Sequence, residues 1–331
     1  MARACHRVPA PGIPARPPPR RLIVRGAALV ATLALLPPLI GFHPYYVYVL
    51  STAFLFATLA TAWNLLAYGG QISFGHAAFF GLGAYGAALT SLAGVSPWAA
   101  IAAGGAVAVA GALLIGAAAA RLGGAALALA TLAYAELWRG IAQNWTAVSG
   151  GGAGLVGIPP LPTLAAVPLD LTRGHTGSYY VSLAVLAAAL GVFGLMTRSR
   201  LGLALRAVRE AADRAALLGI RPITWKLASF ALSALLTGLA GGLYVHMVRV
   251  VEPDLVFGRF FSIVPLVMAM FGGLHSVLGP TLAALGLHLF SELLLHPVAP
   301  ALHQLPYAVA LIVVILYLPG GLASLAKAPR D

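Results

Sequence analysis

The sequence contains a single cysteine, Cys5, and very little charge. A single cysteine excludes a disulfide framework within the chain and a metal site built from several cysteines. Charged residues make up 8% of the 331 residues, about a third of the share in a typical soluble domain. Hydrophobic residues make up 60%, and they gather in the long apolar runs that membrane-spanning helices require. The composition therefore predicts an integral membrane protein.

Acidic residues are especially scarce, at eight against 20 Lys and Arg, which gives a formal net charge of +12. This charge does not indicate nucleic-acid binding. The basic residues stand between apolar runs, and the positive-inside rule of membrane topology accounts for them. The lipid bilayer is therefore an expected partner, and nucleic acid is not.

Motifs for enzyme chemistry are also missing. The chain has no Gly-Lys dipeptide and hence no phosphate-binding P-loop. Its nine histidines include no His-Glu-x-x-His and no pair four residues apart, so a metal site has little support. Ser73 near His76 is a weak nucleophile pair at best. GLGAYG at 81–86 fits a dinucleotide pattern but lies within an apolar run, where helix packing explains it better. We expect no catalytic residue and no cofactor in this chain.

Apolar runs separated by polar residues, glycine or proline predict an all-α, polytopic helical bundle with about ten membrane crossings. Glycine and proline interrupt the runs 72–94 and 260–297, so short or re-entrant helices covered by protein are expected there. Gly238 and Gly242 form a GxxxG pattern that favours close helix packing. The predicted crossings are 26–43, 46–67, 72–94, 97–119, 124–142, 179–197, 225–247, 260–274, 279–297 and 305–325.

The N-terminal segment 1–25 holds six arginines, six prolines and no acid. Its prolines exclude a continuous helix, so we expect a disordered cytoplasmic tail ahead of a membrane domain at 26–326. A twin-arginine signal at Arg20-Arg21 and an organellar transit peptide are the alternatives.

Successive crossings alternate in direction across the membrane. Starting from a cytoplasmic tail, this alternation assigns each loop to one side. The segment 198–224 falls in the cytoplasm, and Lys and Arg number seven from Arg198 to Lys226. The loops 143–178 and 248–259 fall outside. The basic segments thus share one side, as the positive-inside rule requires, and both termini are expected to be cytoplasmic.

Charge is concentrated in that interior segment, which holds nine charged residues from Arg198 to Lys226. Residues 198–219 predict a short, rigid amphipathic helix at the cytoplasmic surface, with Gly219 as its stop and Pro222 barring continuation. The usual connection has about 4–6 residues, so this length favours a docking surface over a solvated connector whose arginines only fix topology. The expected apolar stripe is Leu201, Leu205, Val208, Ala212, Ala215 and Gly219, and the expected ion pairs are Arg206–Glu210, Arg209–Asp213 and Glu210–Arg214.

Five stretches, in order, resemble the branched-chain amino-acid permease family of ATP-binding-cassette (ABC) importers, in its LivM-type branch. REAADRAALLGI (209–220) resembles the EAA loop of ABC-importer permeases. The other four are AWNLLAYGGQISFGHAAFFGLGAYGAAL (62–89), TLAYAELWRGIAQNWTAVSGGGAGLVGIP (131–159), RSRLGLALRAVRE (198–210) and FGGLHSVLGPTLAA (271–284). The resemblance covers about residues 45–325. It departs from the family pattern at Gly219, which follows the glutamate by nine residues rather than six, at Ala211, where a second acid is frequent, and at His275, where glycine is more usual.

The resemblance implies a bacterial inner-membrane subunit that forms a translocation path and binds no ATP itself. It implies four partner subunits: a homologous second permease (LivH-like), two ATPase subunits (LivG/LivF-like) that bind ATP, and an extracytoplasmic substrate-binding protein. Branched-chain amino acids are the expected substrate, with urea, amides or aromatic acids as alternatives within the family. An ion-coupled secondary transporter acting alone is the alternative from another class. The residues expected to couple to the ATPases are Arg206, Arg209, Glu210, Ala211, Ala212, Asp213, Arg214 and Gly219.

Polar residues inside a membrane are costly and therefore mark candidate functional positions. Gln71 and Ser73 are candidates for the path, with hydrogen bonds to irregular backbone as the alternative. Glu136 either lines the path or forms a local ion pair with Arg139 near the outer surface. The full set of candidate path residues is Asn64, Gln71, Ser73, His76 and Glu136.

Overall fold

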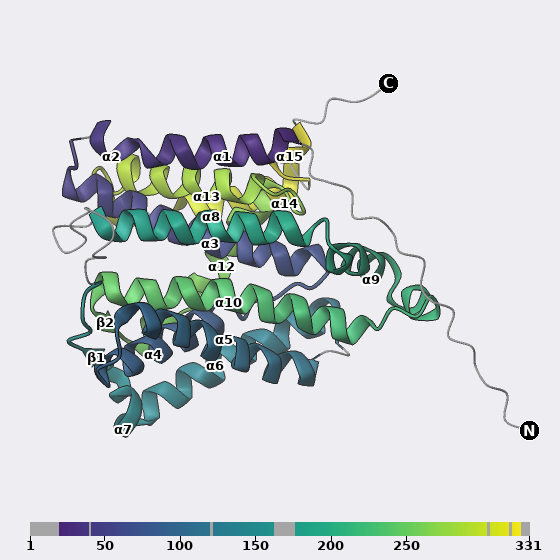
Figure 1. Cartoon of the computed structure of the whole chain (residues 1–331), viewed down its shortest axis with the longest axis horizontal. Coiled ribbons are helices and arrows are strands. Elements are labelled where there is room, and N and C mark those ends of the chain that lie inside the picture. The colour runs from purple at the N-terminus through teal and green to yellow at the C-terminus, as the bar shows by residue number, and fades with distance from the viewer. Residues whose placement is uncertain are drawn as a thin grey trace, which may run out of the picture.

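The computed structural model describes residues 20–39, 41–119, 122–161, 176–302, 305–317 and 320–325, which form a helical bundle (Figure 1). The first half comprises α1 Arg20–Ala34, α2 Leu36–Leu39, α3 Pro44–Tyr68, α4 His76–Leu92, α5 Pro97–Ala119, α6 Gly124–Asn144, α7 Thr146–Ser149, the 3-10 turn η1 Gly151–Ala153 and strand β1 Leu155–Val156. The second half comprises α8 Thr176–Met196, α9 Arg200–Leu217, α10 Pro222–Val248, strand β2 Val250–Val251, α11 Pro253–Val256, α12 Phe260–Gly272, α13 Gly279–Leu289, the π-helical turn η2 Phe290–Leu295, the 3-10 turn η3 Pro300–Leu302, α14 Leu305–Tyr317 and α15 Leu322–Leu325.

Helix α1 begins at Arg20, before the predicted end of the basic tail at residue 25. Pro19 is the last proline of the tail and stands directly before the helix. Because proline is tolerated at a helix start but not inside it, the backbone is free to be helical from there. Residues 1–19 lie outside the described residues, so their disorder stays a prediction.

Each predicted crossing overlaps a described helix, but fewer than ten are long and apolar enough to cross a membrane by themselves. Within the part of the chain that the structure describes, five meet that standard of length and composition: α3, α5, α8, α10 and the run Pro253–Gly272 that joins α11 to α12. Shorter apolar helices are Gly26–Leu39, Gly279–Leu295 and Leu305–Val314. A polytopic helical bundle is therefore present, while the count of ten crossings stays a prediction.

The interrupted runs form short helices, as predicted. Helix α4 begins only at His76 and has 17 residues, α13 has 11, and Pro265 lies inside the 13-residue α12. The stretch before α4 is irregular, with Gly70 at φ +76°. A Cβ at Gly75 would lie 2.5 Å from the carbonyl oxygen of Thr131 in α6. This linker therefore follows a path against α6 that a larger residue at 75 would obstruct.

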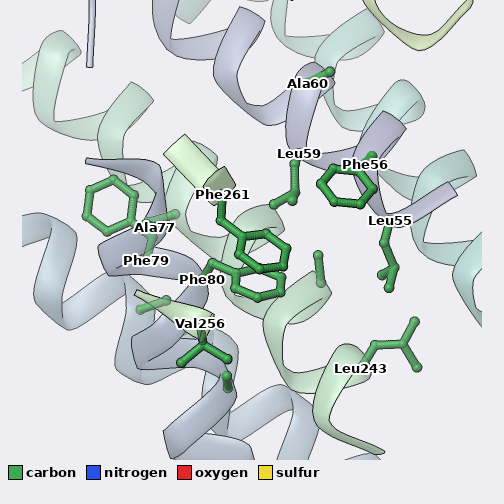
Figure 2. Packing of buried hydrophobic residues seen from close by; sticks show 14 of the residues in the cluster. Leu55, Phe56, Leu59, Ala60, Ala77, Phe79, Phe80, Leu243, Val256 and Phe261 are labelled. Atoms are coloured by element: carbon green, nitrogen blue, oxygen red, sulfur yellow. The ribbon is translucent and has the colours of Figure 1, made fainter. Parts of the chain in front are cut away.

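Helix α3 is the centre of the bundle, and its side chains are buried almost throughout. It packs against α8, α10, α12 and α13. Figure 2 shows the aromatic core beside it, where the rings of Phe80 and Phe261 stack with centroids 4.1 Å apart. Phe56 of α3 lies parallel to Phe261 at 5.7 Å. The consecutive helices α3 and α4 thus share one stack of rings with α12, which is distant in sequence.

Glycines bring α4, α5 and α10 into close contact. A Cβ at Gly104 of α5 would overlap the carbonyl oxygen of Gly83 in α4, and a Cβ at Gly83 would overlap the backbone of Gly238 in α10. The GLGAYG stretch lies within a helix, as expected for packing. In lipid, such small residues allow the backbone-to-backbone approach that drives helix association.

The bundle has two distinct ends (Figure 1). One end carries α7, β1 and β2, where Leu155 pairs with Val251 and Val156 with Val250 in a short antiparallel ladder. The other end carries α9 and α15. Two segments that the charge pattern assigns to the outside, 143–178 and 248–259, therefore meet through β1 and β2 at one end, and the basic segment 198–224 lies at the other.

The close contact among α4, α5 and α10 predicts that one added methyl group destabilises the fold at this contact but not elsewhere. Gly104→Ala is expected to destabilise the fold by about 1–3 kcal/mol, because overpacking forces two backbones apart. The control is Gly191→Ala in α8, where a Cβ meets nothing within 4 Å and alanine favours the helix. The thermal unfolding midpoint of the detergent-solubilised chain, followed by tryptophan fluorescence, checks this. Equal midpoints for the two variants would refute the close packing.

Candidate functional site

The charged segment forms a helix, as predicted, and its ends agree closely with the expected ones. Helix α9 spans Arg200–Leu217. Gly219 follows with φ +82°. The backbone N–H of Gly219 bonds to Ala216 at 3.0 Å and that of Ile220 to Ala215 at 3.1 Å, which is the Schellman arrangement that ends helices at a left-handed glycine.

The apolar face of α9 is seated on the membrane helices. Leu205 is fully buried in a cluster with residues of α3, α8 and α10, and Val208 is buried as well. A Cβ at Gly69, just after α3, would lie 2.9 Å from the Leu205 side chain. Of the predicted stripe, Leu205, Val208 and Ala215 are buried, Leu201 and Ala212 are half-buried, and Gly219 is exposed.

The expectation of one continuous rigid helix is wrong. Ala211 has φ −161° and ψ 96°, so α9 consists of two helical pieces joined at a kink. Alanine has the highest helix propensity, so the break cannot come from local preference and has to come from packing. The first piece carries the seated residues Leu205 and Val208, whereas Asp213, Arg214 and Leu217 of the second are exposed.

The three expected ion pairs are also absent: among the described residues, none of Arg206–Glu210, Arg209–Asp213 and Glu210–Arg214 lies within ion-pair distance. The kink removes the i,i+4 register of the two pairs that cross Ala211. The remaining pair places its arginine before its glutamate, the weaker orientation in a helix. The charges of Arg206, Glu210, Asp213 and Arg214 are instead exposed, and this set is the exposed charged face of α9.

Arg209 differs from its charged neighbours because it turns inward to the end of α3. Its guanidinium carbon lies 5.7 Å from the ring centroid of Tyr68, and its Nη1 donates to the Tyr68 carbonyl at 3.5 Å. A Cβ at Gly70 would lie 2.8 Å from its Cγ. Because a helix C-terminus carries partial negative charge, a cation is favourable here. The pKa of the nearby His275 imidazole is lowered, chiefly by desolvation and secondarily by the charge of Arg209.

Asn64 and Gln71 form hydrogen bonds that tie irregular backbone to helices. Asn64 accepts from the backbone N–H of His275 and donates to the carbonyl of Ser276, both at 2.8 Å. Gln71 donates from Nε2 to the Oγ of Ser229 in α10 at 2.7 Å. Both side chains are buried. The α3–α4 linker and the α12–α13 linker are thus fixed to the same end of the bundle as α9.

Ser73 and His76 are buried beside them, but they do not bond to each other. The Oγ of Ser73 accepts from the backbone N–H of Gly75, and its carbonyl accepts from Trp63. The Nε2 of His76 lies 3.0 Å from the Oγ of Ser233, which itself donates to the Ala62 carbonyl. The nucleophile-pair interpretation is therefore wrong. We call Asn64, Gln71, Ser73 and His76 the polar joint.

Glu136 lies apart from the polar joint, near α11, in a chain of four charges. Its carboxylate meets Arg139 at 2.7 Å, the local pair anticipated from the sequence, and Arg259 at 2.9 Å. Arg139 also meets Asp254 at 2.9 Å, and Gln143 donates to the same carboxylate oxygen at 2.7 Å. Exposed pairs of this kind stabilise by about 0–1 kcal/mol each. Their effect here is to hold α6 against the segment 253–259.

A cavity of about 580 Å³ lies between α3 and the α11–α14 region. Sequence reasoning missed it, because its walls come from five separate parts of the chain. One signal was present: Glu292 is an ionisable residue inside a predicted crossing, and such residues are functional candidates by default. None of the polar joint, nor Glu136, lines it. The lining residues are Tyr48, Val49, Thr52, Phe56, Tyr244, Asp254, Leu255, Gly258, Arg259, Phe260, Phe261, His288, Glu292 and Tyr307.

Comparison with known proteins gives a consistent result. The family model described as "Branched-chain amino acid transport system / permease component" matches residues 45–318. The chain is 29% identical over 246 residues to the high-affinity branched-chain amino acid transport system permease protein LivM of Escherichia coli (strain K12), and equally to that of Salmonella typhimurium (strain LT2). Each alignment covers 68% of this chain and 57% of the relative, so the matched part spans less than two thirds of either relative. No solved structure matches the chain.

The polar joint predicts a local effect of losing the Asn64 amide. Asn64→Ala leaves the His275 N–H and the Ser276 carbonyl without their partner, which is expected to cost about 1–3 kcal/mol. Hydrogen–deuterium exchange of the peptide around 273–278 is expected to accelerate selectively. Asn144→Ala is the control, because the exposed Asn144 donates to the Gly140 carbonyl of its own helix. Unchanged exchange around 273–278 in Asn64→Ala would contradict the assigned role.

Proposed function

The chain belongs to the branched-chain amino acid transport permease family, and from that premise we propose that it is the membrane subunit of an ATP-driven importer of branched-chain amino acids. The family is one of multi-pass membrane transport permeases rather than enzymes. In the proposed importer the chain forms the path together with a homologous second permease. Two ATPase subunits bind and hydrolyse ATP, and an extracytoplasmic binding protein delivers the substrate.

The observation that carries the proposal is the division of α9 into a seated and an exposed part. Leu205 and Arg209 hold the first piece against the end of α3. Glu210, Asp213 and Arg214 present charge to water. A partner that binds the exposed charges and then moves would therefore displace the membrane helices through the contacts of Leu205 and Arg209. This arrangement suits a coupling helix that transmits movement from an ATPase.

The polar joint extends that connection into the bundle. Arg209 contacts the last residue of α3, and Asn64, one turn earlier in α3, holds the backbone at 275–276. Gln71 holds α10 through Ser229. Displacement of α9 then reaches α12, α13 and α10 by direct hydrogen bonds. We assign Asn64, Gln71, Ser73 and His76 to the moving wall of the path on this basis, and Glu136 to its outer rim.

The need for such coupling follows from the substrate. An amino acid is a zwitterion at neutral pH, and moving its charges unaided into hydrocarbon costs many kcal/mol. A protein-lined path removes the barrier but gives transport no direction. Directed uptake requires that the path open to one side at a time, and a nucleotide cycle in partner subunits supplies that order.

The proposed topology has ten crossings with α9 and both termini in the cytoplasm. It is supported by the meeting of β1 with β2 at the end opposite α9, because both strands lie in loops that the charge pattern assigns to the outside. With the exposed charges in the cytoplasm, they face the compartment that contains ATP.

The exposed charged face of α9 predicts a transport defect without a folding defect. Glu210→Ala with Arg214→Ala is expected to lower uptake of labelled leucine on the order of tenfold, since losing about 1.4 kcal/mol of docking free energy costs that factor. Membrane insertion is expected to be unchanged. Arg221→Ala, an exposed charge beyond the helix stop, is the control. Wild-type uptake by the double variant would contradict the docking role.

Reconstitution separates the proposal from a transporter that works alone. Liposomes with the complete set of subunits, the binding protein and internal ATP are expected to accumulate leucine. Liposomes with this chain alone are expected to accumulate none under a proton or sodium gradient. Accumulation driven by an ion gradient without ATPase subunits would overturn the proposal.

A further inference from the structure

We propose that the cavity between α3 and the α11–α14 region is a binding site for the amino-acid zwitterion, which rests on the proposed function and names where this chain holds its substrate. The cavity is lined by residues near the start of α3, such as Tyr48 and Thr52, and by Asp254 and Arg259. Helix α3 begins at Pro44, and Asp254 and Arg259 come soon after strand β2. The ladder of β1 and β2 lies at the end of the bundle opposite α9 (Figure 1). In the proposed topology, this end faces the outside.

The inner wall of the cavity is apolar and aromatic. Phe56, Phe261 and Tyr307 are no more than 8% exposed. His288 is also buried there, but its ring nitrogens lie 3.0 Å from the Thr52 Oγ1 and 3.2 Å from the Tyr307 hydroxyl. Both nitrogens are therefore engaged within the protein. This wall offers an apolar side chain a place to pack and offers a charged group none.

The mouth of the cavity carries charges of both signs. Arg259 and Asp254 have side chains that are 71% and 64% exposed, and Glu292 lines the same cavity. A ligand that extends from this mouth to the aromatic wall needs one positive group, one negative group and an apolar part. An α-amino acid with a hydrophobic side chain has all three.

The two ends of the zwitterion have distinct partners. Arg259 meets Glu136 through Nε, and its two Nη groups make no hydrogen bond with any other described residue. A guanidinium presents these groups to a carboxylate as a pair of parallel donors. The Glu292 carboxylate forms no ion pair with a cation of the described residues. Arg259 therefore receives the substrate carboxylate and Glu292 the substrate ammonium.

Glu136 and Arg139 act as supports for this site. The Glu136 carboxylate fixes the Arg259 Nε at 2.9 Å, which turns the guanidinium without consuming its remaining donors. Arg139 and Gln143 hold Asp254. The Asp254 carboxylate is thereby occupied, whereas that of Glu292, which also lines the cavity, has no cationic partner among the described residues.

Equilibrium binding of labelled leucine to the full chain in phosphatidylcholine nanodiscs tests the site. Arg259→Gln and Glu292→Gln are each expected to weaken binding about tenfold or more, the loss of one charge-assisted pair. The matched controls are Arg249→Gln and Glu252→Gln, which remove exposed charges on either side of β2 at the same end but no residue of the cavity or its supports. Both controls are expected to bind as wild type. Equal loss in controls and site variants would overturn the site.

Leucine analogues assign each charge. Wild type is expected to prefer leucine to isoamylamine, which lacks the carboxylate, and to 4-methylpentanoate, which lacks the ammonium. Arg259→Gln is expected to lose the first preference and keep the second, and Glu292→Gln the reverse. Retention of both preferences in both variants would overturn the assignment even if a variant binds weakly for reasons of folding.

A phosphatidylethanolamine headgroup carries the same pair of charges, so the lipid is varied as well. Leucine binding is expected to be undiminished when phosphatidylethanolamine is added to the nanodiscs. Abolition of leucine binding by that lipid would identify the cavity as a lipid site and overturn the inference. In the complete importer, normal leucine transport by Arg259→Gln and Glu292→Gln would refute this site and leave the proposed function standing, whereas no amino-acid transport by the wild-type importer would refute the proposed function.

Discussion

A polar group inside an apolar bundle has to find its hydrogen-bond partner within the protein, and the architecture of this chain follows from that constraint. The two irregular linkers, before α4 and before α13, expose backbone that no helix satisfies. Asn64 supplies both a donor and an acceptor to one, and Gln71 anchors the other to α10. Because each of these bonds crosses between elements distant in sequence, satisfying the backbone also fastens the helices to one another. These hydrogen bonds satisfy the irregular backbone of the linkers. They also couple any movement of the linkers to movement of the helices.

Glycine has the complementary role where α4, α5 and α10 meet. Lipid tails are as apolar as leucine, so no hydrophobic gain drives helices together within a membrane, and close backbone contact has to do so. Gly83, Gly104 and Gly238 provide it. These three helices form a tightly packed unit, whereas the cavity is lined largely by α3 and by the short pieces α11, α12, α13 and η2.

Hydropathy, together with the polar residues, glycines and prolines between apolar runs, was sufficient to locate the helices. Burial in lipid is decided by composition over about 20 residues. They also located the C-terminal end of α9, since Gly219 and Pro222 act locally. They did not reveal the kink at Ala211, where a strong helix former is overridden by packing on α3 and α8. Nor did they reveal the cavity. Thr52 and Arg259 are unremarkable in their own windows, and the one signal, the ionisable Glu292 inside a predicted crossing, does not reveal its neighbours. The three acquire a common role only when the fold brings α3, the start of α12 and η2 together.

Helix α10 has 27 residues, which makes it a rod about 40 Å long that reaches from the Gln71 anchor to strand β2. At its far end, His246 lies 2.7 Å from the Pro159 carbonyl, and β2 pairs with β1. Such a rod works as a lever: a tilt of about 5° shifts one tip by about 3.5 Å relative to the other over this length. The ladder of β1 and β2 would then be displaced when α9 moves at the opposite end of the bundle.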